Sequence, residues 1–515
     1  MTEAIIRAYS DLLYPAHPFP EMHPNQIAVM GTLFGMQPAP PERCRMLELG
    51  CGAGGSLIPF AMVLPESSFL GVDITEKAIT QAQQTAKELG LRNVEFRCAD
   101  ILEMPEACGP FDYIGAHGVY SWVPPVVREK ILALCAASLA PHGIAYISYN
   151  ARPGSDLRRM HREMMLFHTQ SAETPAERVQ QARLFTEFLA AAKEGNEIYN
   201  TVCNWNRERI AKLPDPLVFH DDLGTFNEPF FFLDFVRAAA AHNLQYVSES
   251  DLSSMSERRF EPAMRQKLAE MGSNVFAAEQ YMDFLSGRSF RETLLCHANV
   301  PLQRKLDPRS VAGMSFTSQL TPVAEQPDIA GAAEEEFRAA KGRSIRTSHP
   351  LAKAILFELG KVFPAALAFE ELREGVEKHL GPTDRLTLAN GILETYASGP
   401  LLALHIAPPK CAAAVSQRPV LSPLARIQVA AGAPVMTNLN CHVIDVGDAL
   451  LRKLLLLLDG QHDRAALVQE LAAAIRAGAI PAPANMTPGR ALEEELAEGV
   501  EQQLQMARRF ALLVS

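Results

Sequence analysis

Short apolar runs alternate with amphipathic stretches along residues 45–150 of the chain. The apolar runs have the length of buried strands, and the stretches between them repeat apolar residues at helical spacing. This alternation predicts βαβ units and therefore an α/β fold with a Rossmann-like, doubly wound sheet. The expected strands cover residues 45–50, 67–73, 93–100, 111–118 and 143–150, and the clearest helices cover residues 76–89 and 125–139.

The pattern changes after this first domain. Residues 155–215 are rich in Arg, Glu, Ala and Met and poor in β-branched residues, which predicts a helical insertion. Residues 216–318 form a middle domain, in which an amphipathic helix precedes a strand at 244–249. Prolines, glycines and an acidic run indicate a linker over residues 319–345.

The C-terminal region, residues 346–515, is mostly helical by its apolar spacing. Three helices, expected over residues 349–363, 369–380 and 384–397, precede a strand-like run at 401–407. This order of elements resembles a winged helix. The tail from Val443 onward predicts two or three further helices.

The overall charge of the chain is acidic. Its 48 basic and 59 acidic residues give a formal net charge of −11, which argues against a global electrostatic grip on nucleic acid or anionic lipid. The segment MTEAIIRAYSDLLYPAHPFPEMHP lacks the basic and apolar regions of a signal peptide, and the most apolar stretch, residues 450–458, is too short to cross a bilayer. We therefore expect a cytoplasmic protein that does not act at a membrane.

The cysteines and histidines do not predict a metal site. Nine cysteines are spread along the chain with no CxxC pair, and no His cluster has zinc spacing, so we expect reduced thiols and no metal. His161 and His168 lie in a helical run beside Met160, Met164 and Met165, where packing explains them better than metal binding.

A glycine-rich loop, ELGCGAGG from Glu48, stands between the first predicted strand and a helix. Glycines at this place let the backbone approach a nucleotide-like ligand closely. Because Gly50, Gly52 and Gly55 also satisfy the GxGxxG pattern, the loop alone would suit NAD or FAD equally well.

Three carboxylates near the loop help to distinguish the cofactors. Asp73 ends the second strand, 23 residues after Gly50, where it can accept hydrogen bonds from both ribose hydroxyls of an adenosine. Glu48 precedes the loop, and Asp100 ends the third strand. Carboxylates suit the ammonium and sulfonium charges of S-adenosylmethionine (SAM) and would repel a pyrophosphate. We therefore predict SAM as the cofactor and S-adenosylhomocysteine as its product, with a dinucleotide as the alternative.

The motifs LELGCGAGG, GVDIT, CADI and FDYI together resemble the consecutive strand-end motifs of class I SAM-dependent methyltransferases. The resemblance implies that Gly50 and Gly52 line the methionyl end of the cofactor and that Asp73 binds its ribose. It also implies that Asp100 and Ile101 meet the adenine. The other residues of the predicted cofactor set are Glu48, Cys51, Gly54, Ile74, His117, Tyr14 and His23.

Further motifs resemble methyltransferases that carry a methyltransferase regulatory domain, among which are bacterial protein lysine methyltransferases. These motifs are YPAHPFPEMHP near the start, HGVYSWVP after the fourth strand and FHDDLGTFNEPF in the middle domain. The resemblance implies a SAM-binding core with an N-terminal lid at residues 1–154 and a regulatory domain at 216–318. It also implies a protein substrate and a homodimer formed through the helical insertion.

The carboxyl ends of parallel strands face the ligand crevice, so we expect the acceptor side of the site there. His117 and Asn150 should approach the methyl group, and Tyr120 and Trp122 should line the acceptor channel. His117 could act as a base, orient the acceptor, or only pack against the cofactor. Tyr120 and Trp122 could equally be core aromatics, and Asn150 a turn residue.

The proline-rich segment before the sheet contains Tyr14, Phe19 and His23. By the family resemblance we expect it to fold over the cofactor as a lid; the alternative is a loose arm on the surface.

Three functions remain open from the sequence. The first is a protein methyltransferase acting on lysine, and the second is a small-molecule N- or O-methyltransferase. The third is a non-catalytic regulator that binds SAM, or nucleic acid through the winged-helix-like region. The acidic charge and the complete cofactor motifs disfavour the third. We predict a SAM-dependent methyltransferase that takes a protein substrate.

Overall fold

The computed structural model describes residues 12–192, 196–339, 342–483 and 490–515. Parts of the predicted lid, helical insertion, linker and C-terminal region therefore lie outside the described residues. Within these ranges, no helix combines the length and the apolar character needed to span a membrane.

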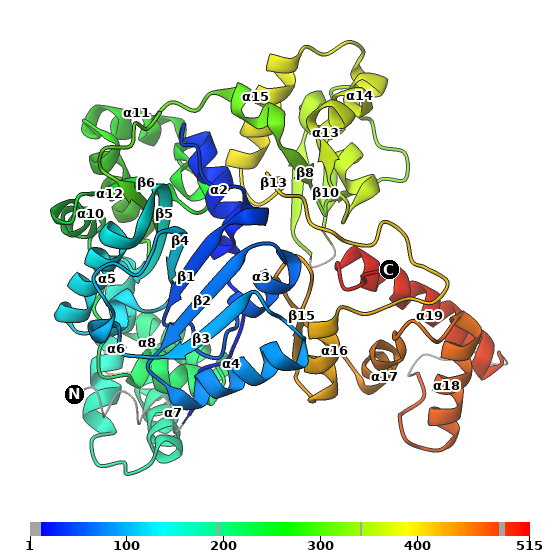
Figure 1. Ribbon diagram of the computed structural model, residues 1–515, viewed down its shortest axis with the longest axis horizontal. Helices are drawn as coiled ribbons and strands as arrows, with labels where there is room; N and C mark the ends of the chain where they lie inside the picture. The colour runs from blue at the N-terminus through cyan, green and yellow to red at the C-terminus, as the bar shows by residue number, and fades with distance from the viewer. Residues whose placement is uncertain (1–11, 193–195, 340–341, 484–489) are drawn as a thin grey trace.

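A seven-stranded sheet forms the centre of the part of the molecule seen on the left of Figure 1. Its strands are β1 (Arg45–Leu49), β2 (Ser68–Asp73), β3 (Val94–Cys98), β4 (Phe111–Ala116), β5 (Leu139–Asn150), β6 (Leu244–Glu249) and β7 (Phe290–His297). They run in the order β3-β2-β1-β4-β5-β7-β6, and only β7 is antiparallel to its neighbours. The five strands expected in the first domain all form, which confirms the Rossmann-like fold.

The last two strands of this sheet come from the middle region of the chain. β7 pairs with β5 from Ala145↔Leu295 to Asn150↔Phe290, and β6 pairs with the other edge of β7. The middle region therefore completes the first sheet instead of building a separate one. The sequence predicts β6 but not its place in the sheet, because strand pairing across such a separation leaves no local pattern.

Helices cover both faces of the sheet, and the alternation of side chains along each strand divides the core in two. On β1, Met46 belongs to the core under α2 (Pro24–Leu33) and α3 (Leu57–Val63), whereas Leu47 and Leu49 belong to the core of the opposite face. α4 (Glu76–Glu88) contributes to the first core, and α5 (Pro125–Ser138) and α10 (Phe232–Ala241) contribute to the second.

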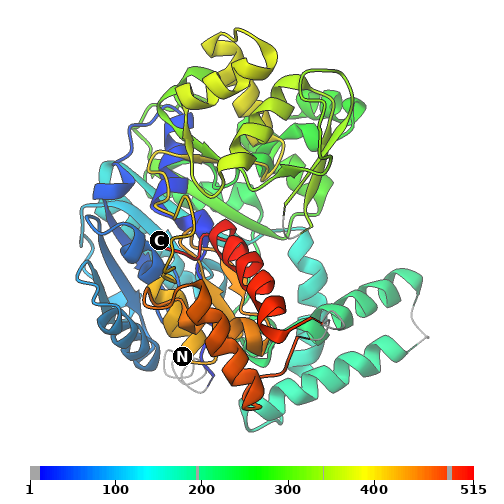
Figure 2. The ribbon, with the colours of Figure 1, turned by 90° about the vertical axis from the view of Figure 1, so that its right-hand side faces the viewer.

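The predicted helical insertion consists of three helices that extend away from the sheet (Figure 2). They are α6 (Gly154–His168), α7 (Pro175–Ala191) and α8 (Glu197–Lys212). His161 packs inside their core with Nε2 3.0 Å from Thr186 Oγ1, and His168 stacks on Phe185 with ring centroids 4.4 Å apart. In the part of the chain that the structure describes, no group of three or more His, Cys, Asp or Glu side chains could hold a metal ion.

Residues 319–345 differ from the linker that their composition suggests. β9 (Thr321–Pro322), β10 (Glu335–Arg338) and β11 (Ser344–Thr347) form an antiparallel sheet, and Phe337 is fully buried. The buried Lys353 donates hydrogen bonds of 2.9 Å to the carbonyl oxygens of Gly331 and Ala333. The ammonium of a later helix thus stabilises the irregular stretch between β9 and β10. The composition of residues 319–345 alone does not predict this contact.

The C-terminal region contains the helices that the sequence predicts. α13 (Pro350–Val362), α14 (Phe369–Leu380) and α15 (Arg385–Ala397) pack with the sheet of β8 (Ser315–Thr317), β12 (Leu367–Ala368) and β13 (Ala403–His405). A second unit consists of α16 (Pro423–Ala430), β14 (Val435–Thr437), β15 (Val443–Asp445), α17 (Ala449–Leu457), α18 (Arg464–Arg476) and α19 (Leu492–Arg509).

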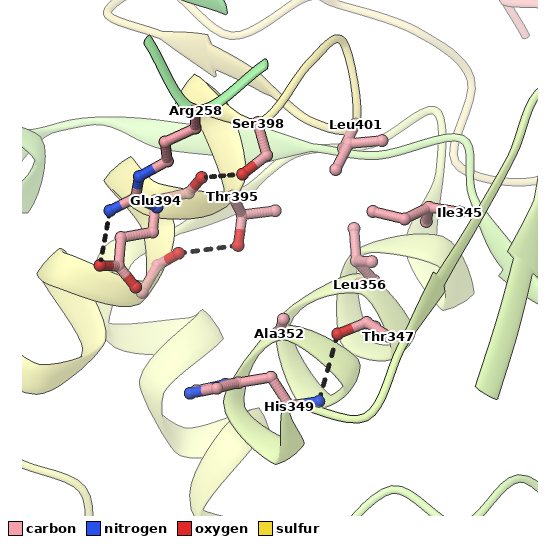
Figure 3. A pocket seen from close by; sticks show the side chains of 11 residues that line it. Arg258, Ile345, Thr347, His349, Ala352, Leu356, Glu394, Thr395, Ser398 and Leu401 are labelled. Carbon is pink, nitrogen blue, oxygen red and sulfur yellow. Dashed lines mark hydrogen bonds and ion pairs between the residues drawn. The ribbon is translucent and has the colours of Figure 1, made fainter. Parts of the chain in front are cut away.

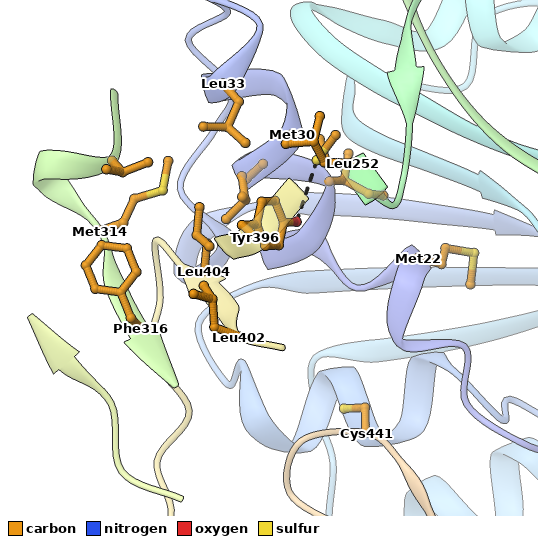
Figure 4. Close-up of a cluster of buried hydrophobic side chains, with 14 of the residues drawn as sticks. Met22, Met30, Leu33, Leu252, Met314, Phe316, Tyr396, Leu402, Leu404 and Cys441 are labelled. Atoms are coloured by element: carbon orange, nitrogen blue, oxygen red, sulfur yellow. Dashed lines mark hydrogen bonds between the residues drawn. The ribbon is translucent and has the colours of Figure 1, made fainter. Parts of the chain in front are cut away.

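The first of these units packs against the N-terminal helix α2. Figure 4 shows Met30 and Leu33 of α2 in one apolar cluster with Tyr396 and Leu404, and the Tyr396 hydroxyl lies 3.7 Å from the sulfur of Met30. Asn25 donates from its amide to the carbonyl oxygen of Leu404 at 3.2 Å. Segments 379 residues apart in the sequence thus share one core.

Candidate active site

A cavity of about 310 Å³ opens at the carboxyl ends of β1, β2, β4 and β5. This is the edge of an open parallel sheet at which ligands bind. The predicted site residues that line it are Tyr14, Phe19, Glu48, Gly50, Cys51, Gly52, Asp73, His117, Trp122 and Asn150. The structure therefore brings together most of the candidates from four separate strand ends and the N-terminal segment.

The glycine loop between β1 and α3 forms the floor of the cavity. Gly50 and Gly52 have φ values of +75° and +51°, a left-handed conformation that favours glycine. A Cβ on Gly52 would meet nothing within 4 Å, whereas one on Gly50 would lie 2.5 Å from Val119. Gly52 therefore leaves open space on the cavity side, which a ligand can occupy.

Two carboxylates stand beside this loop. Asp73 accepts hydrogen bonds from the backbone N–H groups of Gly52 at 2.9 Å and Thr75 at 2.8 Å, so its position is fixed. Glu48 is buried, and its Oε2 has no hydrogen-bond partner. Burial, and then the charge of Asp73, raise the pKa of Glu48 to about 8. A buried oxygen without a partner next to open space is suited to a cationic ligand, and the ammonium of SAM fits this requirement.

His117 lies between the N-terminal segment and the sheet. Its ring stacks on Phe19 with centroids 3.5 Å apart, and its Nδ1 is 2.8 Å from the hydroxyl of Tyr146. Burial lowers the pKa of His117 to about 3. The imidazole is therefore neutral at physiological pH. It can accept a hydrogen bond, but it is too weak a base to hold a proton taken from the acceptor.

The cavity is also lined by residues that the sequence motifs do not indicate. Asp221, on the π-helical turn η5 (Val218–Asp222), lines the cavity together with Arg158 and Phe290. Burial raises the pKa of Asp221 to about 6, partly offset by Arg158 and by a hydrogen bond with Tyr14. The two adjacent acids of the motif FHDDLGTF could have indicated a functional residue here. The sequence around them does not show that this turn lies at the edge of the sheet.

The N-terminal segment covers the glycine loop. A Cβ on Gly55 would lie 2.7 Å from the carbonyl oxygen of His17, so the two backbones are in close contact. Phe19 also donates its backbone N–H to Ser56 Oγ at 3.3 Å. The described part of the segment therefore packs on the glycine loop and is not a loose arm, and its action as a lid stays a prediction.

Three family models match the chain: a methyltransferase domain at residues 41–206, a predicted methyltransferase regulatory domain at 214–297, and the C-terminal winged helix domain of PKMT at 417–512. An uncharacterised protein of Rickettsia prowazekii is 34% identical over 393 residues, which are 75% of this chain and 70% of the relative. A second protein of that organism is 37% identical over 235 residues, or 45% of this chain and 93% of the relative.

The whole fold also matches a solved structure, that of PKMT2 from Rickettsia typhi in complex with AdoHcy. The TM-score is 0.86 at 28% identity, and the match covers 98% of this chain and 100% of PKMT2. The chain belongs to the class I SAM-dependent methyltransferases that carry a methyltransferase regulatory domain. SAM is the cofactor of this methyltransferase.

The winged helix domain lies further toward the C-terminus than the order of the predicted helices and strands suggested. The winged-helix order of elements occurs at residues 349–407, whereas the family model covers the second C-terminal unit, from residue 417 to 512. Both units combine helices with a short antiparallel sheet, so the pattern of elements alone does not separate them.

Several predicted site residues of the methyltransferase lie outside the cavity. Tyr120 is buried in the core, with its ring centroid 5.1 Å from that of Phe235, so it does not line an acceptor channel. His23 caps α2 by accepting a hydrogen bond of 3.1 Å from the backbone N–H of Asn25. Both are held by the fold and were selected from the sequence because a motif carries no information on side-chain direction.

The residues predicted to contact the adenine do not line the cavity. Asp100 accepts a hydrogen bond from the backbone N–H of Leu102 at 2.9 Å, and Ile74 and Ile101 also lie outside the cavity lining. A Cβ on Gly54 would lie 2.8 Å from Phe96, so this glycine serves packing. The contact of Asp100, Ile101 and Ile74 with the adenine stays a prediction.

A second cavity of the methyltransferase, of about 220 Å³, lies between β11, α13 and α15 (Figure 3). Its polar lining includes His349 and the ion pair between Arg258 and Glu394, whose charged atoms are 3.1 Å apart. None of the residues that the sequence marks for SAM or the acceptor lies in it. The first cavity is therefore the candidate active site.

Proposed function

We propose that this methyltransferase transfers the methyl group of SAM to the ε-amino group of a lysine side chain in a protein substrate. The observation that carries this proposal is Asp221, a carboxylate that lines the same cavity as the aromatic side chains of Tyr14, Trp122 and Phe290. A carboxylate attracts an alkylammonium ion, and aromatic faces favour a cation further. The similarity to PKMT2 over the whole chain supports the same class of substrate.

SAM, when bound, supplies a methyl group that is activated by the sulfonium charge. Glu48 would hold its ammonium and Asp73 its ribose, and the lid over Gly55 would exclude water from the reacting atoms. Asp221 would hold the lysine ammonium, and the amine would lose its proton to solvent before water is excluded from the site. The new N–C bond then forms as the C–S bond breaks, with its electron pair going to sulfur, and the residues contribute mainly position.

The test is a comparison of Asp221→Asn with the wild-type protein. Radiolabelled SAM and lysine-containing protein fractions should give methyl-lysine on hydrolysis. The substitution should raise the KM for the protein by about 10-fold or more, since a charge-assisted contact of about 1.5–3 kcal/mol is lost. Asp234→Asn is the matched control because Asp234 is exposed on α10 and pairs with Arg237. Label found only in small molecules would contradict the proposal.

We further propose that the protein forms a homodimer through the helical insertion. Large apolar side chains are exposed on α6, α7 and α8, and among them Phe167, Phe188 and Ile198 are 76%, 68% and 79% exposed. Such a concentration of exposed apolar residues on three adjacent helices is typical of an interaction surface. We also expect a cytoplasmic location, which suits the nine free cysteines.

A further inference from the structure

Three polar side chains form a continuous hydrogen-bonded chain from the cavity to the middle region. His117 Nδ1 lies 2.8 Å from the hydroxyl of Tyr146 on β5, and that hydroxyl donates to Glu292 Oε1 on β7 at 2.7 Å. Ser250 places its hydroxyl 3.3 Å from the other oxygen of Glu292. Only His117 of the three lines the cavity.

The direction of the hydrogen bonds determines the tautomer of His117. A hydroxyl has one proton, so a Tyr146 that donates to the Glu292 carboxylate must accept from His117. His117 then carries its proton on Nδ1. Its Nε2 is left as the nitrogen with a free lone pair.

We propose that Glu292, acting through Tyr146, is a positioning residue that holds His117 as the Nδ1–H tautomer. Nε2 of His117 then accepts a hydrogen bond from an N–H of the acceptor amine, and this bond turns the lone pair of the amine nitrogen toward the methyl group. The acceptor amine in this inference rests on the proposed function. Glu292 lies within residues 214–297, the segment matched by the regulatory domain model. That segment therefore takes part in the geometry of the active site.

The surroundings of Glu292 make this chain sensitive to pH. Burial, and then the charges of Glu21 and Glu249, raise the pKa of Glu292 to about 7, while Tyr146 and Ser250 oppose the shift. Above this pH the carboxylate accepts from Tyr146 and His117 is the Nδ1–H tautomer. Below it a protonated Glu292 can donate to Tyr146, which reverses the chain and places the proton of His117 on Nε2, where it can no longer accept.

The test reads the tautomer directly and needs no acceptor. The full-length protein is labelled with ¹⁵N-histidine, saturated with S-adenosylhomocysteine, and compared with Glu292→Gln and Tyr146→Phe between pH 6 and pH 8.5. The resonances of His117 are identified by their loss in His117→Asn. Glu95→Gln and Tyr281→Phe are matched controls, because Glu95 is an exposed partner of Arg97 and Tyr281 lies on α12 (Val275–Ser286), outside the cavity.

We expect the Nδ1–H tautomer in the wild-type protein at pH 8, with conversion near pH 7, and the Nε2–H tautomer or a mixture in both variants. With a lysine peptide as substrate, both variants should lose about 10- to 100-fold in kcat with the KM for SAM unchanged, because His117 would no longer orient the acceptor. An Nε2–H tautomer in the wild type at pH 8, or a tautomer unaffected by either substitution, would overturn the proposal. If the tautomer behaves as expected while lysine peptides stay unmethylated, the acceptor class is wrong and the positioning role stands.

Discussion

Glu48 is the residue whose surroundings matter most for the cofactor. It is buried beside Asp73, and one of its oxygens has no hydrogen-bond partner. Its sequence position, two residues before Gly50, suggests a cationic ligand, but only the structure shows that the carboxylate is isolated from other partners. A site with an unpartnered carboxylate is incomplete without a positive charge.

We therefore expect proton release when SAM binds at pH 7. With a pKa of about 8 in the free protein, Glu48 is mostly protonated at pH 7 and must ionise to hold the ammonium. The affinity for SAM should rise by up to tenfold per pH unit between pH 6 and pH 8 and level off above. Calorimetry in two buffers of different ionisation enthalpy measures the proton directly.

The variant Glu48→Gln provides the contrast for this measurement. It should bind SAM about 10- to 100-fold more weakly, release no proton and lose the pH dependence below pH 8. Equal proton release by the variant and the wild type would assign the titration to another group.

At the scale of elements, the sequence predicts well whatever depends on local pattern. The strand at residues 67–73 and the helix at 76–89 appear as β2 and α4 within one residue, because apolar periodicity and Gly-rich ends are local properties. The sequence does not predict β7, whose partner β5 is far away in the chain, and the composition of residues 319–345 suggests a linker where β9, β10 and the start of β11 form. Lys353, from a later helix, holds the turn between β9 and β10, and local composition carries no sign of that contact.

A substitution in the glycine loop after β1 tests whether this loop forms the floor of the SAM site. Gly52→Val should abolish SAM binding, since the side chain would fill open space on the cavity side, while the fold is retained. Gly90→Val is the matched control: Gly90 has a similar φ of +66° and equally open surroundings, but it lies at the end of α4.

Both substitutions should cost a similar stability, about 1–2 kcal/mol for a side chain in the left-handed region. Thermal unfolding measures this cost, and calorimetry measures SAM binding. If Gly52→Val and Gly90→Val bind SAM equally well, the loop does not form the floor of the cofactor site.

At the scale of the whole molecule, the middle region and the first domain form one structural unit. Arg291 on β7 is fully buried and makes ion pairs of 2.6 to 3.0 Å with Glu249, Glu279 and Asp283. The same strand supplies the backbone partners of β5 and the neighbours Phe290 and Glu292 of the active site. Residues far apart in sequence therefore build this part of the cavity together.

The helical insertion is the part of the molecule through which we expect two copies to associate. Phe188→Asp should shift a dimer to a monomer, because a carboxylate would enter an apolar contact between copies. Val126→Asp is the matched control, since Val126 is 59% exposed on α5, away from the insertion. Sedimentation equilibrium gives the mass of each protein. A wild-type monomer, or a dimer that survives Phe188→Asp, would contradict this assembly.

The sequence alone determined the Rossmann-like domain, the glycine loop and the carboxylates Glu48 and Asp73, because each belongs to a short segment with its own pattern or motif. The tertiary structure alone decided that Tyr120 and His23 lie outside the cavity, that Asp221 and Phe290 line it, and that Glu292 is connected to His117 through Tyr146. Side-chain direction and contacts between distant segments depend on how the whole chain packs. The residues proposed for the cofactor were therefore largely visible from the sequence, whereas those proposed for the acceptor come together only when the middle region completes the sheet.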